Sequence, residues 1–174
     1  MVLEFTLTIK SIINFCFIAS SYKDTGAAWV LARNGEVPPN AVVGGREGDV
    51  DLYVARFYTK DGHLIPGKLH PRTRRAYNSF GGKELSSDVY QVLTHPDQAR
   101  QLKWVPATPG AIPTGALQGG QGRSGVLYIA RAPHQSFVIC GKVGSDKMYV
   151  PLNGREITVG EGYEILCVTS VTCD

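Results

Sequence analysis

Two stretches of the chain, about 75 residues apart, carry the same pattern. The first is AVVGGREGDVDLYVAR (residues 41–56) and the second is ALQGGQGRSGVLYIAR (residues 116–131); both have a double glycine followed by a Leu-Tyr-hydrophobe-Ala-Arg run. The match continues on both sides, pairing Trp29-Val30 with Trp104-Val105, Gly67-Lys68 with Gly141-Lys142, and FGGKE (80–84) with LNGRE (152–156). Self-similarity of this kind indicates one structural unit written twice.

Each unit reads as short apolar runs separated by Gly, Pro, Asn and Asp turns, which predicts strands rather than helices. The 174 residues include 20 Gly and 10 Pro, as is typical of a turn-rich all-β protein. In LYVAR and LYIAR the alternation puts Arg56 and Arg131 on apolar faces, where an arginine usually borders a core or pairs with a carboxylate. Because one small β unit has an apolar face to cover, we predict an all-β fold of two tandem repeats packed as pseudo-twofold β-sandwich units.

The repeat divides the chain into an N-terminal extension (1–28), a first repeat (29–94), a linker (95–103), a second repeat (104–168) and a tail (169–174). A helix is predicted for HPDQARQLKW (95–104). In the extension, EFTLTIK (4–10) alternates like a strand, whereas SIINFCFIAS (11–20) is an apolar run that could belong to a secretory signal. Both interpretations stay open; the second would make the protein secreted.

The cysteines and the charge restrict the compartment and the partners. Cys16, Cys140, Cys167 and Cys173 form no CxxC pair, and we interpret them as free, mostly buried thiols, which favours a reducing, cytoplasmic compartment. A net charge of +3 is too small to indicate a nucleic-acid partner.

Motifs for catalysis or for metal binding are missing from the sequence. The glycine-rich GGQGRSG (119–125) lacks the Lys-Ser/Thr pair of a phosphate loop and reads as a hairpin turn, and EGDVD (47–51) lacks the spacing of a calcium loop. The four histidines, His63, His70, His95 and His134, lie on predicted loops, where most histidines are surface residues. The sequence therefore predicts no enzyme, no metal and no cofactor.

Polar residues beside the glycine turns are the candidate binding groups. Glu47 follows the double glycine, and Lys68 and Lys142 end the two Gly-Lys elements. A carboxylate accepts and an ammonium donates, so such a pair could hold vicinal sugar hydroxyls. The alternative is a surface ion pair worth about 0–1 kcal/mol.

A basic run, HPRTRRAY (70–77), is the main charge cluster. It reads either as a solvated loop or as a contact for an anionic membrane or phosphate group through Arg72, Arg74 and Arg75.

The ordered elements W-V, G-x-[VI]-P, G-G, L-Y-[VI]-x-R and G-K, present twice over roughly residues 29–168, resemble the DM-nine repeat family. Characterised members include invertebrate mannose-binding lectins of innate pathogen recognition, built of tandem β-sandwich units and associating as homodimers. Other members are cytosolic, vesicle-associated or infection-responsive. In the lectins, the acid after the double glycine and the lysine of the G-K element bind the sugar.

By position, the resemblance implies a carbohydrate site at Glu47 and Lys68, with Lys142 but no acid in the second repeat, where Gly122 stands. The family usually has Asp at the acidic position and a loop about one residue longer, so Asp49 or Asp51 could supply the carboxylate instead. We therefore expect a metal-independent lectin-like protein whose partners are mannose-containing glycans. The alternative is an intracellular adaptor or membrane-associated interaction protein that keeps the fold without binding sugar.

Overall fold

The computed structural model describes residues 26–97, 101–144 and 146–169. The strand predicted at 4–10 and the apolar run at 11–20 lie outside the described residues, as do Cys16 and Cys173. In the part that is described, no helix is long and apolar enough to cross a membrane.

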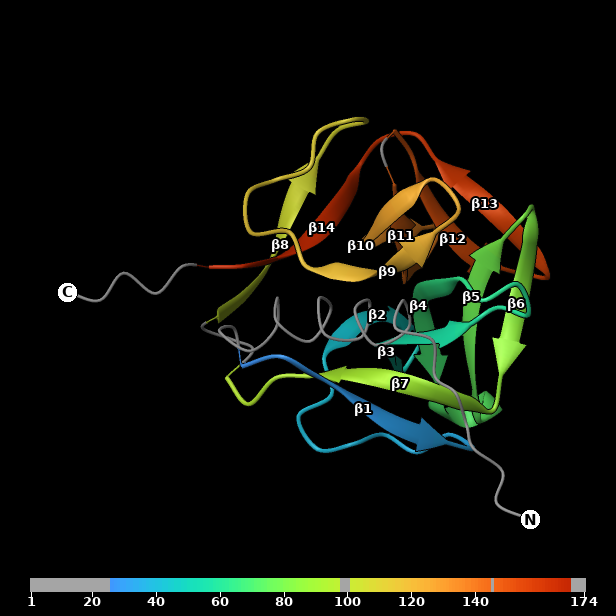
Figure 1. Cartoon of the computed structure of the whole chain (residues 1–174). Coiled ribbons are helices and arrows are strands. Elements are labelled where there is room, and N and C mark those ends of the chain that lie inside the picture. Colours follow the sequence, from blue (N-terminus) through green and yellow to red (C-terminus); the bar gives the residue numbers. More distant parts are fainter. Residues whose placement is uncertain (1–25, 98–100, 145, 170–174) are drawn as a thin grey trace, which may run out of the picture.

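Within the described residues, each repeat forms seven strands in the same order (Figure 1). The first contains β1 (Ala28–Arg33), β2 (Val43–Glu47), β3 (Val50–Tyr58), β4 (Leu64–His70), β5 (Arg75–Phe80), β6 (Lys83–Ser87) and β7 (Val89–Thr94), with a short 3-10 helix η1 (Pro71–Thr73) between β4 and β5. The second contains β8 (Leu102–Ala107), β9 (Gln118–Gly122), β10 (Gly125–His134), β11 (Phe137–Val143), β12 (Met148–Leu152), β13 (Arg155–Val159) and β14 (Tyr163–Val168). The predicted all-β fold of two repeats is confirmed.

The segment between the repeats departs from the helix predicted for 95–104. Gln101 donates its amide to the carbonyl of Asp97 at 3.1 Å, one helical turn away. From Leu102 onward, however, the chain is strand β8, because it pairs with β14 in the register Leu102 to Val168. Tertiary pairing thus overrides the local helical pattern over residues 102–104.

Strand pairing inside the two repeats follows one scheme. In the first repeat β1 pairs with β7, β7 with β3, β3 with β2 and β4, β4 with β5, and β5 with β6. Adding seven to each number gives the pairing of the second repeat. The two halves are therefore related by pseudo-twofold symmetry, as the internal repeat predicts.

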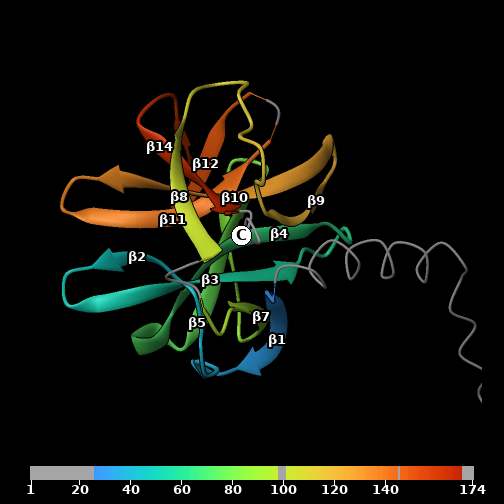
Figure 2. The same ribbon diagram turned by 90° about the vertical axis from the view of Figure 1, so that its left-hand side faces the viewer.

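The repeats are joined through hydrogen-bonded strands as well as packed side chains. β2 pairs with β11 at Arg46 and Val138, and β4 pairs with β9 at Leu64 and Gln121. On the other side of the molecule β6 pairs with β13. As a result, β2, β3, β4, β9, β10 and β11 form a closed ring, and both repeats belong to one 14-stranded sheet (Figure 2).

Glycine makes the two inter-repeat junctions possible. A Cβ on Gly45 would overlap the carbonyl of Val138, and a Cβ on Gly120 would overlap the carbonyl of Leu64. The second glycine of each double-glycine pair, in β2 and in β9, is thus required where one repeat's backbone approaches the other's.

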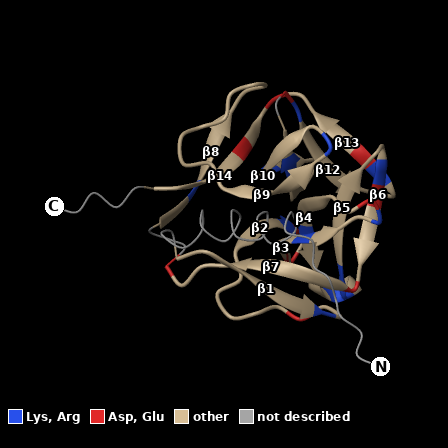
Figure 3. Ribbon diagram, viewed as in Figure 1, with Lys and Arg blue, Asp and Glu red and all other residues tan. Residues whose placement is uncertain are grey.

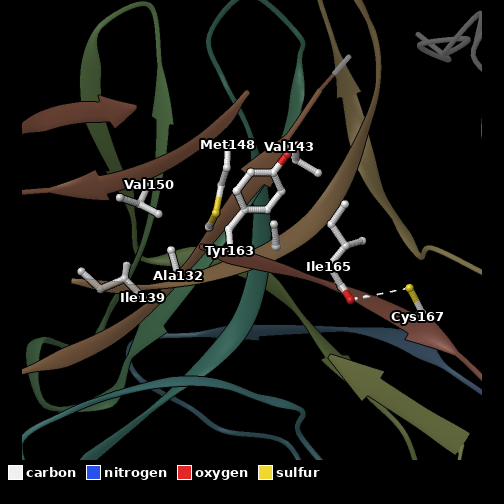
Figure 4. Packing of buried hydrophobic residues seen from close by; sticks show 9 residues of the cluster. Ala132, Ile139, Val143, Met148, Val150, Tyr163, Ile165 and Cys167 are labelled. Atoms are coloured by element: carbon white, nitrogen blue, oxygen red, sulfur yellow. Dashed lines mark hydrogen bonds between the residues drawn. The ribbon is translucent and has the colours of Figure 1, made fainter. Parts of the chain in front are cut away.

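The buried apolar residues of the described ranges form three clusters. The central one joins the repeats and includes Val54, Leu93, Ile129 and Leu166, with Trp29 and Trp104 packed against it. Each repeat also has a cluster of its own. Figure 4 shows the one in the second repeat, where residues from β10, β11, β12 and β14 surround Tyr163.

Candidate functional site

Glu47 and Lys68 come to lie on the same face of the sheet. Residues that pair across antiparallel strands share a face, as do residues two apart along a strand. Glu47 pairs with Val50, and Lys68 pairs with Val54, four residues further along β3. The structure thus places the acid and the lysine on one face but on strands β2 and β4, with β3 between them.

His70 lies between these two residues and was not predicted as part of the site. It ends β4, two residues after Lys68, and its Nε2 is 3.8 Å from Oε2 of Glu47. Within the described residues, its buried Nδ1 has no hydrogen-bond partner. A buried ring nitrogen without a partner is uncommon, because desolvation is then uncompensated. Glu47 is more open, with 37% of its side chain exposed.

Lys68 is largely covered and has partners other than Glu47. Its side chain is 6% exposed, and its ammonium donates to the carbonyl of Pro151 at 3.0 Å. The same nitrogen is 3.9 Å from Oε1 of Glu84 and 5.7 Å from the ring centre of Tyr77. The lysine therefore links the first repeat to the second.

Lys142 makes the equivalent contacts from the second repeat. Its ammonium lies 2.7 Å from Oε1 of Glu156 and donates to the carbonyl of Ser79. Burial lowers the pKa of Lys142, and the hydrogen bond with Glu156 opposes that shift. The predicted site residue in the second repeat is thus also an inter-repeat link.

The two acids complete a symmetric network. Glu84 accepts from the amide of Gly154 at 2.7 Å, and Glu156 accepts from the amide of Gly82 at 2.7 Å. We call Lys68, Glu84, Lys142 and Glu156 the axial network, since β6 and β13 meet there; Figure 3 shows basic and acidic residues together on these strands. Each lysine and each acid bonds to backbone of the opposite repeat, so the network holds the repeats in register.

The carboxylate of Asp49 forms an ion pair with Arg72 of the basic run. Arg72 donates to both of its carboxylate oxygens, at 3.0 and 2.7 Å, and this side-chain hydrogen bond lowers the pKa of Asp49. The other two arginines of the run also have partners: Arg74 donates to the carbonyl of Asn34, and Arg75 to the hydroxyl of Ser86.

The second repeat lacks the open part of the site. Gly122 occupies the position of Glu47, and Gly144 that of His70; a Cβ on either would meet the side chain of Leu127. Two polar residues of the first repeat that contact each other are thus both glycine in the second. This joint loss was visible in the aligned repeats and could have identified His70.

The histidines are less exposed than predicted. His70 and His134 end strands rather than lie on loops, and His95 is 1% exposed, with its Nδ1 accepting from the amide of Asp97. The two described cysteines are free and buried, as predicted. Burial raises the pKa of Cys140 to about 12, so this thiol stays protonated at neutral pH. Among the described residues, no group of three or more His, Cys, Asp and Glu is placed to hold a metal ion.

The repeated strand order identifies an all-β protein of two tandem repeats. Strand pairs and the axial network link its two halves. The model of the DM9 repeat matches residues 48–159 and 125–174. The chain therefore belongs to the DM9 repeat family.

One similar solved structure is the nematode sperm cell motility protein MFP2B, with a TM-score of 0.61 and 19% sequence identity. The match covers 86% of this chain and 48% of that chain, so this protein spans about half the length of its structural neighbour. At this identity the likeness concerns the fold alone. Comparison with curated proteins gave no match.

Proposed function

We propose that this protein binds carbohydrate, with a preference for mannose-type glycans, without a metal and without catalysis. The observation that carries the proposal is the placement of Glu47, His70 and Lys68 on one face of the β2–β3–β4 sheet. The resemblance to mannose-binding members of the family supports the same position.

The three residues would contribute differently. Glu47 is the most exposed and would accept hydrogen bonds from two neighbouring hydroxyls. His70, whose side chain is 14% exposed, would add a hydrogen bond through Nε2, the ring nitrogen that faces Glu47. Lys68 lies behind them and fixes β4 against the second repeat, and Tyr77, opposite it on β5, supplies an aromatic ring on the same face.

A single small site of this kind binds weakly, so avidity would come from a homodimer. Two sites held at a fixed distance would favour surfaces with closely spaced mannose residues, as recognition of a microbial surface in innate immunity requires. A cytoplasmic, vesicle-associated protein would meet such glycans on internalised material.

Calorimetric titration with methyl α-D-mannopyranoside and with a high-mannose glycan tests this proposal. We expect Glu47→Gln and His70→Gln to weaken binding at least tenfold. The matched control is Asp61→Asn, an exposed acid in the turn between β3 and β4, at the far end of both strands from Glu47. Failure of the wild type to bind either ligand, by titration and on a glycan array, would rule the proposal out.

The second repeat offers a gain-of-function test. Gly122→Glu with Gly144→His would rebuild the acid and the histidine, and the atoms nearest to both new Cβ positions belong to the side chain of Leu127, which can move. We expect the double variant to bind a second equivalent of sugar. An unchanged stoichiometry in a folded variant would show that Glu47 and His70 do not suffice.

A second candidate is an interaction protein that binds no sugar. MFP2B, which shares the fold, is described as a motility protein, and η1 presents Arg72 on an exposed turn, with 64% of its side chain exposed. In this alternative Arg72, Arg74 and Arg75 contact phosphate groups of an anionic membrane. Salt-sensitive sedimentation with phosphatidylserine vesicles, lost in the triple alanine variant, would favour it over the lectin.

A further inference from the structure

A cleft of about 500 Å³ lies at the junction between β2–β3 of the first repeat and β10, β11 and β14 of the second. Arg46 and Asp51 line one side, and Arg131 and Glu164 the other. Val43 and Pro133 add apolar surface. The cleft is on the opposite face of the β2–β3 hairpin from Glu47, because Arg46 and Asp51 pair with each other one residue away from Glu47 and Val50.

We propose that this cleft is a second saccharide subsite, which binds one residue of a neutral sugar. The inference rests on the proposed function, since it assigns another position on the same protein to the same class of ligand.

The charged groups of the cleft suit an uncharged polyol. Nε of Arg131 donates to Glu164 at 2.7 Å, and Arg46 lies 3.7 Å from Asp51, so the two arginines and two acids balance to zero. A charged ligand would have to compete with one of these pairs. A sugar can instead use the remaining lone pairs and N–H groups, because its hydroxyls both donate and accept.

The shape and accessibility agree with this ligand class. The volume exceeds that of one sugar ring and lies in the range of ordinary ligand pockets. Arg131 and Glu164 are 28% and 35% exposed, open enough to meet a ligand and constrained enough to hold a fixed geometry. The guanidinium of Arg131 also lies 4.5 Å from the ring centre of Trp104, which restricts its movement.

The pseudo-equivalent junction has different chemistry. There Arg56 is only 5% exposed, lies 3.9 Å from the ring centre of Trp29, and donates to Gln91 and to the carbonyl of Gly119. Gln91 replaces the Glu164 of the cleft, and Gln121 and Val126 replace Arg46 and Asp51. The charged quartet therefore occurs at one junction and is not required by the fold, which both junctions share.

An NMR titration of the isotope-labelled full chain with methyl α-D-mannopyranoside tests the inference. We expect two groups of backbone amides to shift, one near Glu47 and His70 and one near Arg131 and Glu164, on the far side of the cleft from β2. The double variant Asp51→Val with Glu164→Gln carries the residues of the other junction, so the fold has an internal precedent for it. This variant should weaken the second group's apparent affinity at least tenfold and leave the first unchanged.

The outcomes separate the two proposals. Shifts confined to the Glu47 group would overturn the cleft subsite and leave the proposed function intact. Shifts confined to the cleft, surviving Glu47→Gln, would support the subsite and remove sugar binding from Glu47. Absence of shifts at saturating sugar would reject both. Asp61→Asn again serves as the control.

Discussion

The axial network and the periphery of this protein differ in how far they keep the internal symmetry. In the axial network, Lys142 and Glu156 of the second repeat are the counterparts of Lys68 and Glu84 of the first. Each lysine donates a hydrogen bond to the equivalent backbone carbonyl of the opposite repeat, and each acid accepts a hydrogen bond from the equivalent backbone amide. At the ends of β2 and β4 the symmetry is lost, since Glu47 and His70 correspond to Gly122 and Gly144. The difference teaches that the matched lysines hold the two repeats together, whereas the unmatched Glu47 is more exposed, with 37% of its side chain accessible.

The largest expected effect concerns the two junction glycines. Gly45→Ala and Gly120→Ala should each destabilise the protein by roughly 3 kcal/mol or more, because the new methyl group would overlap a carbonyl of the opposite repeat. Chemical denaturation should give similar losses for the two variants. Gly160→Ala is the control, since a Cβ there meets no atom within 4 Å; a near-neutral Gly45→Ala would contradict the close approach.

Breaking the axial network should have the next largest effect. Lys142→Met should cost about 2–4 kcal/mol, since it leaves the partly buried Glu156 without its cation. Lys68→Met should cost less, because its nitrogen is 3.9 Å from Glu84 rather than 2.7 Å from Glu156. Denaturant titration of both lysine variants measures the difference, and Glu156→Leu, alone and combined with Lys142→Met, completes a double-mutant cycle. Equal costs for the two lysines would show that the distances do not set the energies.

The two arginines that stack on tryptophan give a smaller contrast. Glu164→Gln should reduce the free energy of unfolding by about 0.5–1 kcal/mol, because the half-exposed pair with Arg131 loses its charge. Gln91→Glu, the reciprocal change, should stabilise by a similar or smaller amount through Arg56. Thermal melts at low and high salt would show both effects shrinking with screening; a salt-independent loss in Glu164→Gln would point to packing instead.

The smallest expected effect is a pH dependence of the free energy of unfolding that comes from the Asp49–Arg72 pair of the first repeat. The hydrogen bond from Arg72 lowers the pKa of Asp49 in the folded state, so the carboxylate contributes stability above its unfolded pKa. That contribution is lost as the pH falls through the lowered value. Asp49→Asn should therefore have a slightly shallower loss of stability in acid than the wild type, measured by denaturation between pH 5 and 2. Identical acid profiles would mean that the exposed pair is energetically silent.

The sequence predicts much of the fold because its signals are local. Double glycines, alternating LYVAR and LYIAR runs and the 75-residue offset indicate strands, turns and a twofold relation without any knowledge of contacts. The cross-repeat pairs Arg46–Val138 and Leu64–Gln121 join residues far apart in the sequence. The alternation of polar and apolar residues along a strand does not identify the strand that it pairs with.

The candidate site was only partly accessible to sequence reasoning. The position of Glu47 followed from its place after the glycines. Lys68 looked like a loop-end cation, yet β4 continues past it and turns its ammonium inward to Pro151. His70, beside a proline, looked like a surface residue, although strand pairing brings it to Glu47.

The closed ring of six strands also bears on how such a chain can diversify. Two identical single-repeat subunits associated about a true twofold axis would form the same pair of junctions, and every substitution would then appear at both. Covalent linkage in one chain removes that constraint. Arg131 can face an acid while Arg56 faces an amide, and one hairpin can lose its acid while the other keeps it. Fusion thus lets an interface that must stay matched coexist with surfaces that are free to evolve separately.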